Sequence, residues 1–337
     1  MVPFVKVRKS PIVKTDPTRH VKGLITFLMV MCASIPNAQP LQEPTELTRF
    51  TLVEYHMGID ARLVVYATDK LVAEKACEAA FKRIGELDGM MSDYRPKSEL
   101  MLLCASPKGT AVKVSNDLYR VLERSQTISR QTGGAFDVTV GPLVQLWRKA
   151  RKDGKLPDSA LIESAKKLVG YRKVKLNSRD HTVTLSDDGM KLDLGGIAKG
   201  YASDEALKVL RKNGIKSALI EMGGDLVLGD APPKTKGWTV SIPNNNSSEL
   251  MLHNCAVSSS GDTEQFVVID GKRYSHVVDP STGQGLTMRL QSTVIAKDGF
   301  TTDPLSTALT LLDERDRYRL LQRYPRAKAF IKNASAD

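Results

Sequence analysis

Three glycines and a lysine stand close together in the segment Asp193-Leu-Gly-Gly-Ile-Ala-Lys-Gly-Tyr201. Residues 190–194 have the composition of a strand, and residues 203–210 place apolar side chains at helical spacing. Glycines at the start of a helix let backbone N–H groups approach an anion, which the helix dipole attracts, and Lys199 adds a positive charge. The glycines match neither the dinucleotide-binding fingerprint nor the phosphate-loop pattern. By itself the segment fits either a phosphate-binding loop or a tight turn without a ligand.

A histidine and an acid lie in a second segment, Tyr274-Ser-His-Val-Val-Asp-Pro-Ser-Thr-Gly283. We expect a strand to carry His276 toward the turn that Pro-Ser-Thr-Gly forms. A histidine exchanges protons near neutral pH, and Asp279 is placed to orient either the ring or the turn. The alternative is a structural histidine that is hydrogen-bonded beside the turn.

The third segment whose residues could bind or react is Thr301-Thr-Asp-Pro-Leu-Ser-Thr307, at the predicted start of the last helix. Thr302 resembles an N-cap and Pro304 suits a first helical turn. Asp303 and Thr307 are four residues apart, so their oxygens project from one helical face. Two such hard ligands, completed by phosphate oxygens, suit Mg²⁺. The alternative is that Asp303 only complements the helix dipole.

Composition and charge narrow the class of protein. The chain has 337 residues, of which 41% are hydrophobic and 26% charged, as is typical of a globular enzyme. The formal charge of +11 is spread along the sequence, without a recognition motif or clustered aromatics. We therefore expect no nucleic-acid partner.

The N-terminus has the features of a targeting segment. A basic stretch precedes the apolar residues 24–35, which are too few for a membrane span of roughly 20 residues. We expect residues 1–38 to be a signal peptide or N-terminal membrane-targeting segment and residues 39–47 to be a linker. The protein would then be periplasmic, or attached to the outer face of the cytoplasmic membrane. Cleavage, an uncleaved anchor and lipidation at Cys32 all stay open, although Met31 is unusual before a lipidated cysteine.

The coarse pattern of elements predicts an α+β fold. Helices are expected over 69–87, 115–131 and 302–323, and a hairpin over 171–185, but strands and helices do not alternate regularly. We expect one large domain of mixed strands and helices over 48–337. The spacing of the cysteines after the signal matches no metal site or disulfide framework, so we expect small core residues. These cysteines are Cys77, Cys104 and Cys255.

Taken in order, the motifs resemble those of the ApbE family of FAD:protein FMN transferases. The resemblance covers about residues 50–332 and rests on eight ordered segments. These segments are Met57-Gly58, 92–100, 133–143 with Leu146-Trp147, 193–201, 221–225, 260–262, 274–283 and 303–307. The resemblance implies the fold of that family, a single domain related to the T-fold.

The same resemblance implies a set of site residues. Those expected to contact FAD are Met57, Tyr94, Ala135, Phe136, Asp137, Asp193, Lys199 and Val277. Those expected to hold Mg²⁺ are Gly196 through its carbonyl, Asp303 and Thr307. The chain also departs from the family pattern. Ser281 stands where an arginine is common, and Thr302 and Pro304 flank Asp303 where alanines are frequent.

The implied reaction moves the FMN part of FAD onto a Thr or Ser hydroxyl of a target flavoprotein through a phosphoester bond and releases AMP. Mg²⁺ and Lys199 would neutralise the charge that develops on the phosphates. We expect His276 to take the proton of the hydroxyl, with Asp303 as the competing candidate. The acceptor would be an electron-transfer subunit that is exported or associated with the inner membrane. Two alternatives stay open, an FAD diphosphatase that gives FMN and AMP and an exported FAD-binding protein without turnover.

Overall fold

The computed structural model describes residues 46–242, 249–261 and 266–333. The predicted signal and most of the predicted linker lie outside the described residues, as does Asp262 of the 260–262 motif. Among the helices within these ranges, none has the length and apolar character needed to cross a membrane.

A seven-stranded sheet forms the centre of the molecule, and every strand pair within it is antiparallel. Its order is β1 (Thr48–His56), β2 (Ile59–Ala67), β6 (Ala218–Met222), β7 (Asp225–Leu228), β10 (Cys255–Gly261), β13 (Leu290–Ala296) and β14 (Lys328–Asn333). All residues of β6 and β7 are buried, so both faces of the sheet are covered there. Antiparallel pairing confirms the predicted α+β class.

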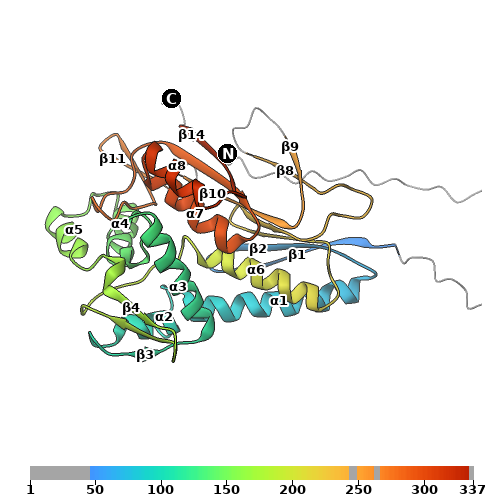
Figure 1. Cartoon of the computed structure of the whole chain (residues 1–337), viewed down its shortest axis with the longest axis horizontal. Coiled ribbons are helices and arrows are strands. Elements are labelled where there is room, and N and C mark those ends of the chain that lie inside the picture. The colour runs from blue at the N-terminus through green and yellow to red at the C-terminus, as the bar shows by residue number, and fades with distance from the viewer. Residues whose placement is uncertain (1–45, 243–248, 262–265, 334–337) are drawn as a thin grey trace, which may run out of the picture.

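Helices cover one face of the sheet and a hairpin covers the other. Figure 1 shows α1 (Lys70–Met91) and α6 (Ala198–Lys212) side by side along one face, with α7 (Gly299–Leu311) packed on β10 and β13. On the opposite face, Trp238 and Val240 of β8 (Trp238–Ser241) pack on the sheet, and β8 pairs with β9 (Glu249–Leu252). Successive side chains of β6 point to opposite faces of the sheet. Ile220 therefore packs in the core under the helices and Leu219 in the core under the hairpin.

The other elements surround one end of this sheet. They are α2 (Glu99–Ala105), β3 (Val112–Lys113), α3 (Asn116–Gln131), η1 (Val138–Val140), α4 (Gly141–Asp153), α5 (Ser159–Lys166), η2 (Tyr171–Lys173), β4 (Val174–Asn177), β5 (Thr182–Leu185), β11 (Phe266–Ile269), β12 (Lys272–Ser275) and α8 (Glu314–Gln322). Short sequence patterns correctly predicted two of these features. Ser115 caps α3 by accepting a hydrogen bond from the Leu118 N–H at 3.2 Å, and β4 pairs with β5 in the predicted hairpin.

Two sequence-based expectations for secondary structure were wrong. Residues 190–194 do not form a strand, because their backbone bonds go elsewhere: the Leu192 N–H donates to Cys104 Sγ and the Asp193 N–H to the Val138 carbonyl. The predicted helix 302–323 is two helices. Leu312 is extended, and Asp313 starts α8 by accepting from the Asp316 N–H at 2.8 Å.

The expectations for Thr302 and the cysteines had different outcomes. Thr302 is not an N-cap, because α7 begins three residues earlier and buries Thr302 against Ser258, with 2.7 Å between their hydroxyls. Cys77, Cys104 and Cys255 are free thiols, and the first two are buried, as predicted. Cys255 is only partly buried.

Candidate active site

Lys199 lies at the centre of a cluster of opposite charges. Its ammonium is 3.0 Å from a carboxylate oxygen of Asp225 and 3.6 Å from one of Asp303, and it donates to the Gly195 carbonyl at 3.3 Å. Asp225 opens β7, whereas Asp303 stands on α7, and their side chains are only 6% and 4% exposed. Two buried acids therefore share one positive charge, which leaves the cluster attractive to a further cation.

Burial and charge shift the pKa values within this cluster. Burial raises the pKa of the Asp303 carboxyl, and the nearby Asp225 adds to this rise while Lys199 opposes it. Burial lowers the pKa of Lys199, but the attraction of Asp225 and Asp303 outweighs it, so its pKa lies well above the usual value. Lys199 is therefore a fixed positive charge across the neutral range.

Close contact between two helices positions Asp303. Its second carboxylate oxygen accepts from the Gly200 N–H at 2.9 Å. A Cβ at Gly200 would lie 2.1 Å from the Gly299 carbonyl oxygen, so only glycine permits this approach of α6 and α7. As part of a phosphate-binding loop, Gly200 would have offered its N–H to a bound phosphate, but this N–H donates to the Asp303 carboxylate instead. Its function is to bring the two helices together.

The three residues predicted to hold a metal lie together. A Cβ at Gly196 would be 3.2 Å from the Thr307 hydroxyl and 3.4 Å from the Phe136 ring. Thr307 follows Asp303 by one turn of α7, as the spacing predicted. Within the part of the chain that the structure describes, no three His, Cys, Asp or Glu side chains form a metal cluster. The candidate set instead combines a carboxylate, a hydroxyl and a backbone carbonyl, hard oxygen donors that suit Mg²⁺.

A second charge cluster connects Tyr94 with Asp193. The Arg148 guanidinium of α4 pairs with Asp93, lies 2.8 Å from a carboxylate oxygen of Asp193, and has its Cζ 4.3 Å from the centroid of the Tyr94 ring. The other oxygen of Asp193 accepts from the Gly195 N–H at 2.8 Å. Two of the residues predicted to contact FAD are thus connected through one arginine.

The residues 135–137 occupy different positions around the site. Phe136 is buried against Gly196, and Ala135 is partly exposed. Asp137 is buried, and its two oxygens accept from the Thr139 N–H, the Thr139 hydroxyl and the Tyr171 N–H at 2.6–2.8 Å. Burial raises the pKa of Asp137, and these hydrogen bonds oppose the rise. They also give Asp137 a structural function that spacing alone did not indicate.

Met57 lies at the tip of the β1–β2 hairpin, on the same end of the sheet as Lys199. His56 pairs with Ile59, so Met57 and Gly58 form a two-residue turn, and both have positive φ (51° and 79°). A positive φ is unfavourable for methionine, and such conformations gather at functional sites. A Cβ at Gly223 would be 3.1 Å from Ile59 and 3.9 Å from Lys199, so the β1–β2 and β6–β7 turns meet beside the cluster.

The segment with His276 and Val277 is fixed to α4. The Trp147 indole donates to the Gly283 carbonyl at 2.9 Å and packs on Tyr274. His276 is partly exposed; Val277 is buried, its N–H donating to the Ser275 hydroxyl and its carbonyl accepting from Leu286.

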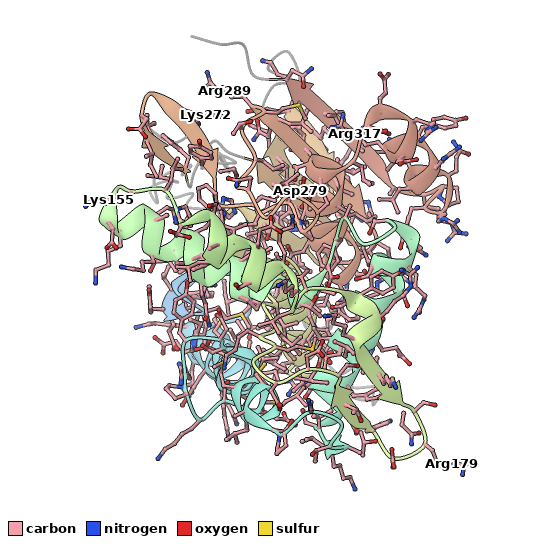
Figure 2. The ribbon with its side chains drawn as sticks, turned by 90° about the vertical axis from the view of Figure 1, so that its left-hand side faces the viewer. Lys155, Arg179, Lys272, Asp279, Arg289 and Arg317 are labelled. Atoms are coloured by element: carbon pink, nitrogen blue, oxygen red, sulfur yellow. The ribbon has the colours of Figure 1, made fainter. Side chains whose placement is uncertain are left out.

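Asp279, the acidic residue of this segment, stabilises the turn. It accepts from the Ser281 N–H and hydroxyl at 2.8 and 2.7 Å. Figure 2 looks onto this face and labels the basic Lys155, Lys272 and Arg289 to one side of Asp279.

Sequence reasoning assigned no function to three residues that the structure places in these clusters. Asp93 and Asp225 stood inside two of the motifs that carried the resemblance, and Arg148 directly follows another. Their positions inside or next to these motifs were the one sign in the sequence that they belong to the site. Arg148 lies 55 residues from Asp93 and 45 from Asp193, and Asp225 lies 26 residues from Lys199, so no local spacing could have paired them.

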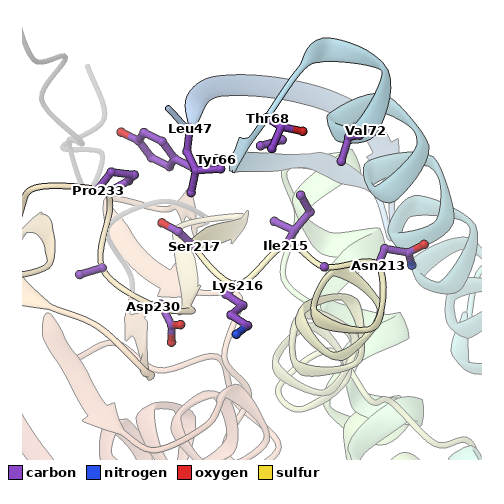
Figure 3. A pocket seen from close by; sticks show the side chains of 13 residues that line it. Leu47, Tyr66, Thr68, Val72, Asn213, Ile215, Lys216, Ser217, Asp230 and Pro233 are labelled. Carbon is purple, nitrogen blue, oxygen red and sulfur yellow. The ribbon is translucent and has the colours of Figure 1, made fainter. Parts of the chain in front are cut away.

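A separate hollow of 440 Å³ lies at the other end of the sheet (Figure 3). Its lining is mainly apolar and includes Tyr66, Val72, Ile215 and Pro233, with Ser217 at the start of β6. None of the predicted site residues lines it.

Comparison with known proteins identifies the family. The family model described as "ApbE family" matches residues 57–331. An FAD:protein FMN transferase of Treponema pallidum is 30% identical over 303 residues, which are 84% of each chain. An FAD:protein FMN transferase of Klebsiella pneumoniae is 30% identical over 75% of this chain and 79% of its own. The chain belongs to the ApbE family.

Solved structures agree with this assignment. The flavin transferase ApbE from Vibrio cholerae superposes with a TM-score of 0.76 at 25% identity, covering 86% of this chain and 95% of its own. The apo form of the Pseudomonas stutzeri flavinyl transferase ApbE gives a TM-score of 0.77 at 26% identity, covering 88% and 94%. The predicted fold class is therefore confirmed.

Proposed function

We propose that this protein transfers the FMN part of FAD to a Thr or Ser hydroxyl of a target flavoprotein, forming a phosphoester bond and releasing AMP. The observation that carries the proposal is the meeting of Gly196, Asp303 and Thr307 beside the Lys199 ammonium. These groups suit a diphosphate and its metal, and the relatives bear the name FAD:protein FMN transferase.

The proposed chemistry is a displacement at the phosphorus of the FMN half. The acceptor hydroxyl oxygen forms a bond to this phosphorus, the bond to the AMP phosphate breaks, and the hydroxyl proton passes to a base. Mg²⁺ held by the three oxygen donors would neutralise charge on the diphosphate. Lys199, fixed between Asp225 and Asp303, would supply a second positive charge for the diphosphate.

His276 is our first candidate for the base. It is partly exposed on a segment that Trp147 fixes to α4, and a neutral imidazole accepts a proton near pH 7. Asp303 is ranked second because its metal-binding function would lower its basicity. We expect His276→Ala to lower transfer and to remove the acidic limb of the pH–rate profile. An unchanged profile between about pH 6 and pH 9 would exclude His276.

The proposal is tested by incubating the protein with FAD, MgCl₂ and an exported electron-transfer protein of the same genome as acceptor. We expect in-gel flavin fluorescence on the acceptor and one AMP for each flavin attached, both abolished by EDTA. AMP and free FMN without labelled acceptor would identify an FAD diphosphatase. Tight FAD binding without AMP would identify a storage protein.

Export is part of the proposal and rests on the sequence alone. A basic stretch and a short apolar run within residues 1–38 support secretion, which would bring the enzyme to exported or membrane-associated acceptors. Cell fractionation of a C-terminally tagged chain tests it. Recovery in the cytoplasmic fraction at full length would contradict export.

A further inference from the structure

Arg148 makes three different contacts with residues from two separate segments. One nitrogen pairs with Asp93, the other lies 2.8 Å from Asp193, and the guanidinium carbon is 4.3 Å from the Tyr94 ring centroid. The Arg148 side chain is 24% exposed, whereas Tyr94 is 73% exposed. The guanidinium therefore supports the ring from the protein side while most of the ring surface stays open.

Only arginine can make these contacts at once. Its planar guanidinium presents nitrogens in fixed directions, so two carboxylates can be paired while one face stacks on an aromatic ring. A lysine ammonium at the same place would neutralise charge but offers no plane for Tyr94. The geometry thus depends on the shape of the side chain as well as its charge.

The electrostatic arrangement also depends on Arg148. Asp93 and Asp193 are only 16% and 12% exposed and both face the guanidinium. Burial raises the pKa of Asp193 and Asp93 adds to the rise, whereas Arg148 opposes it. Without Arg148 the two acids would repel each other in a poorly solvated space.

Asp193 connects Arg148 to the glycine loop. Its other oxygen accepts from the Gly195 N–H at 2.8 Å, and a Cβ at the next residue, Gly196, would lie 3.2 Å from the Thr307 hydroxyl and 3.4 Å from the Phe136 ring. The position of Arg148 thus fixes both the Tyr94 ring and the loop that supplies Gly196.

We infer that Arg148 is a positioning residue of the FAD site, which sets the Tyr94 ring and the 193–196 loop for the flavin nucleotide. It acts through these residues and takes no part in moving the proton or in holding the metal. This inference rests on the proposed function for the identity of the ligand. The structural part of the inference, that Arg148 couples the segment of Asp93 and Tyr94 to the 193–196 loop, does not depend on the proposed function.

The first experiment needs no ligand. Amide hydrogen exchange is measured on the full chain and on Arg148→Met, with Lys149→Met as the matched control. Lys149 neighbours Arg148 on α4 but is 75% exposed and pairs with Asp153 within its own helix. We expect exchange in residues 92–98 and 193–197 to rise about tenfold in Arg148→Met, and to stay unchanged in the control. Unchanged exchange in both segments would overturn the inference.

The second experiment measures FAD binding and transfer separately. We expect Arg148→Met to weaken FAD binding about tenfold or more, while kcat at saturating FAD changes less than about threefold. The affinity of Arg148→Lys for FAD should lie between those of Arg148→Met and the wild type. Arg148→Lys replaces Arg148→Met in the test if the latter does not fold. A loss of kcat with unchanged affinity would overturn the positioning function. Failure of the wild type to bind FAD would instead refute the proposed function, and the exchange result alone would then decide on Arg148.

Discussion

The two ends of the central sheet carry opposite kinds of surface. At the β6–β7 turn, the N-terminus of α6 brings Lys199 between two buried carboxylates. At the other end of the same strand and helix, Ser217 and Ile215 line the apolar hollow of 440 Å³. The hollow offers volume but few polar groups, whereas the candidate site offers charge in little space. Catalysis of phosphoryl transfer depends on placed charge, so the polar end is the better candidate.

The direction of α6 explains part of this difference. Its N-terminus places the positive end of the helix dipole beside the 193–196 loop, and its C-terminus is followed by Asn213 and Gly214 beside the hollow. An anionic substrate is therefore attracted to only one end of the helix. Variants at each end of the sheet test this difference.

Loss of Asp303 should have the largest effect. Asp303→Ala removes a carboxylate from the proposed metal set, and we expect Mg²⁺-dependent flavin transfer to fall by about three orders of magnitude or more. FAD binding should survive in part. Asp230→Asn, beside the apolar hollow, is the control and should change transfer less than about twofold. Normal transfer by Asp303→Ala would refute the metal assignment.

The contact between α6 and α7 should be the next most sensitive. Gly200→Ala places a Cβ 2.1 Å from the Gly299 carbonyl oxygen, so the helices must separate. We expect a loss of about 3 kcal/mol in the free energy of unfolding, measured with urea, and weaker transfer. Gly89→Ala in α1 meets nothing within 4 Å and should be neutral or stabilising. Equal stability of the two variants would contradict the close contact.

The pH dependence of stability should reveal Asp204, which joins the same two helices. Asp204 accepts from the Gly299 and Phe300 N–H groups at 2.9 and 2.8 Å, and burial raises its pKa to about 7. The pKa of Asp204 is higher in the folded than in the unfolded state, so between these two pKa values the folded state keeps a proton that the unfolded state has lost. The free energy of unfolding therefore falls as the pH rises toward 7.

This titration can be isolated with Asp204→Asn, whose side chain does not ionise. Between about pH 5 and pH 8, the wild type should lose roughly 2 kcal/mol of unfolding free energy relative to the variant. Parallel urea-unfolding series on the two proteins measure the difference. A constant difference across this range would show that Asp204 has an ordinary pKa in the folded state.

The smallest effect is expected at the apolar end. The Ser217 hydroxyl is buried and has no hydrogen-bond partner among the residues that the structure describes. Ser217→Ala removes this unsatisfied group, so stability should stay within about 1 kcal/mol of the wild type or increase, with unchanged transfer. A clear loss of transfer would mean that the two ends of the sheet are coupled.

Features that depend on near neighbours could be predicted from the sequence. The cap at Ser115, the hairpin of β4 and β5, and the common helical face of Asp303 and Thr307 all follow from spacings of four residues or fewer, or from short turns. Helical and strand periodicity also sufficed for the α+β class, and ordered motifs sufficed for the family.

Features that depend on distant partners were decided only by the tertiary structure. The sequence determined that residues 193–201 hold glycines before a helix, but the packing of α7 decided that Gly200 serves a helix contact and that its N–H binds Asp303. The sequence also placed an arginine at position 148, but only the fold put it on α4 and brought Asp93, Tyr94 and Asp193 around it. The physical reason is that charge and close contact act through space, whereas capping and periodicity act along the chain.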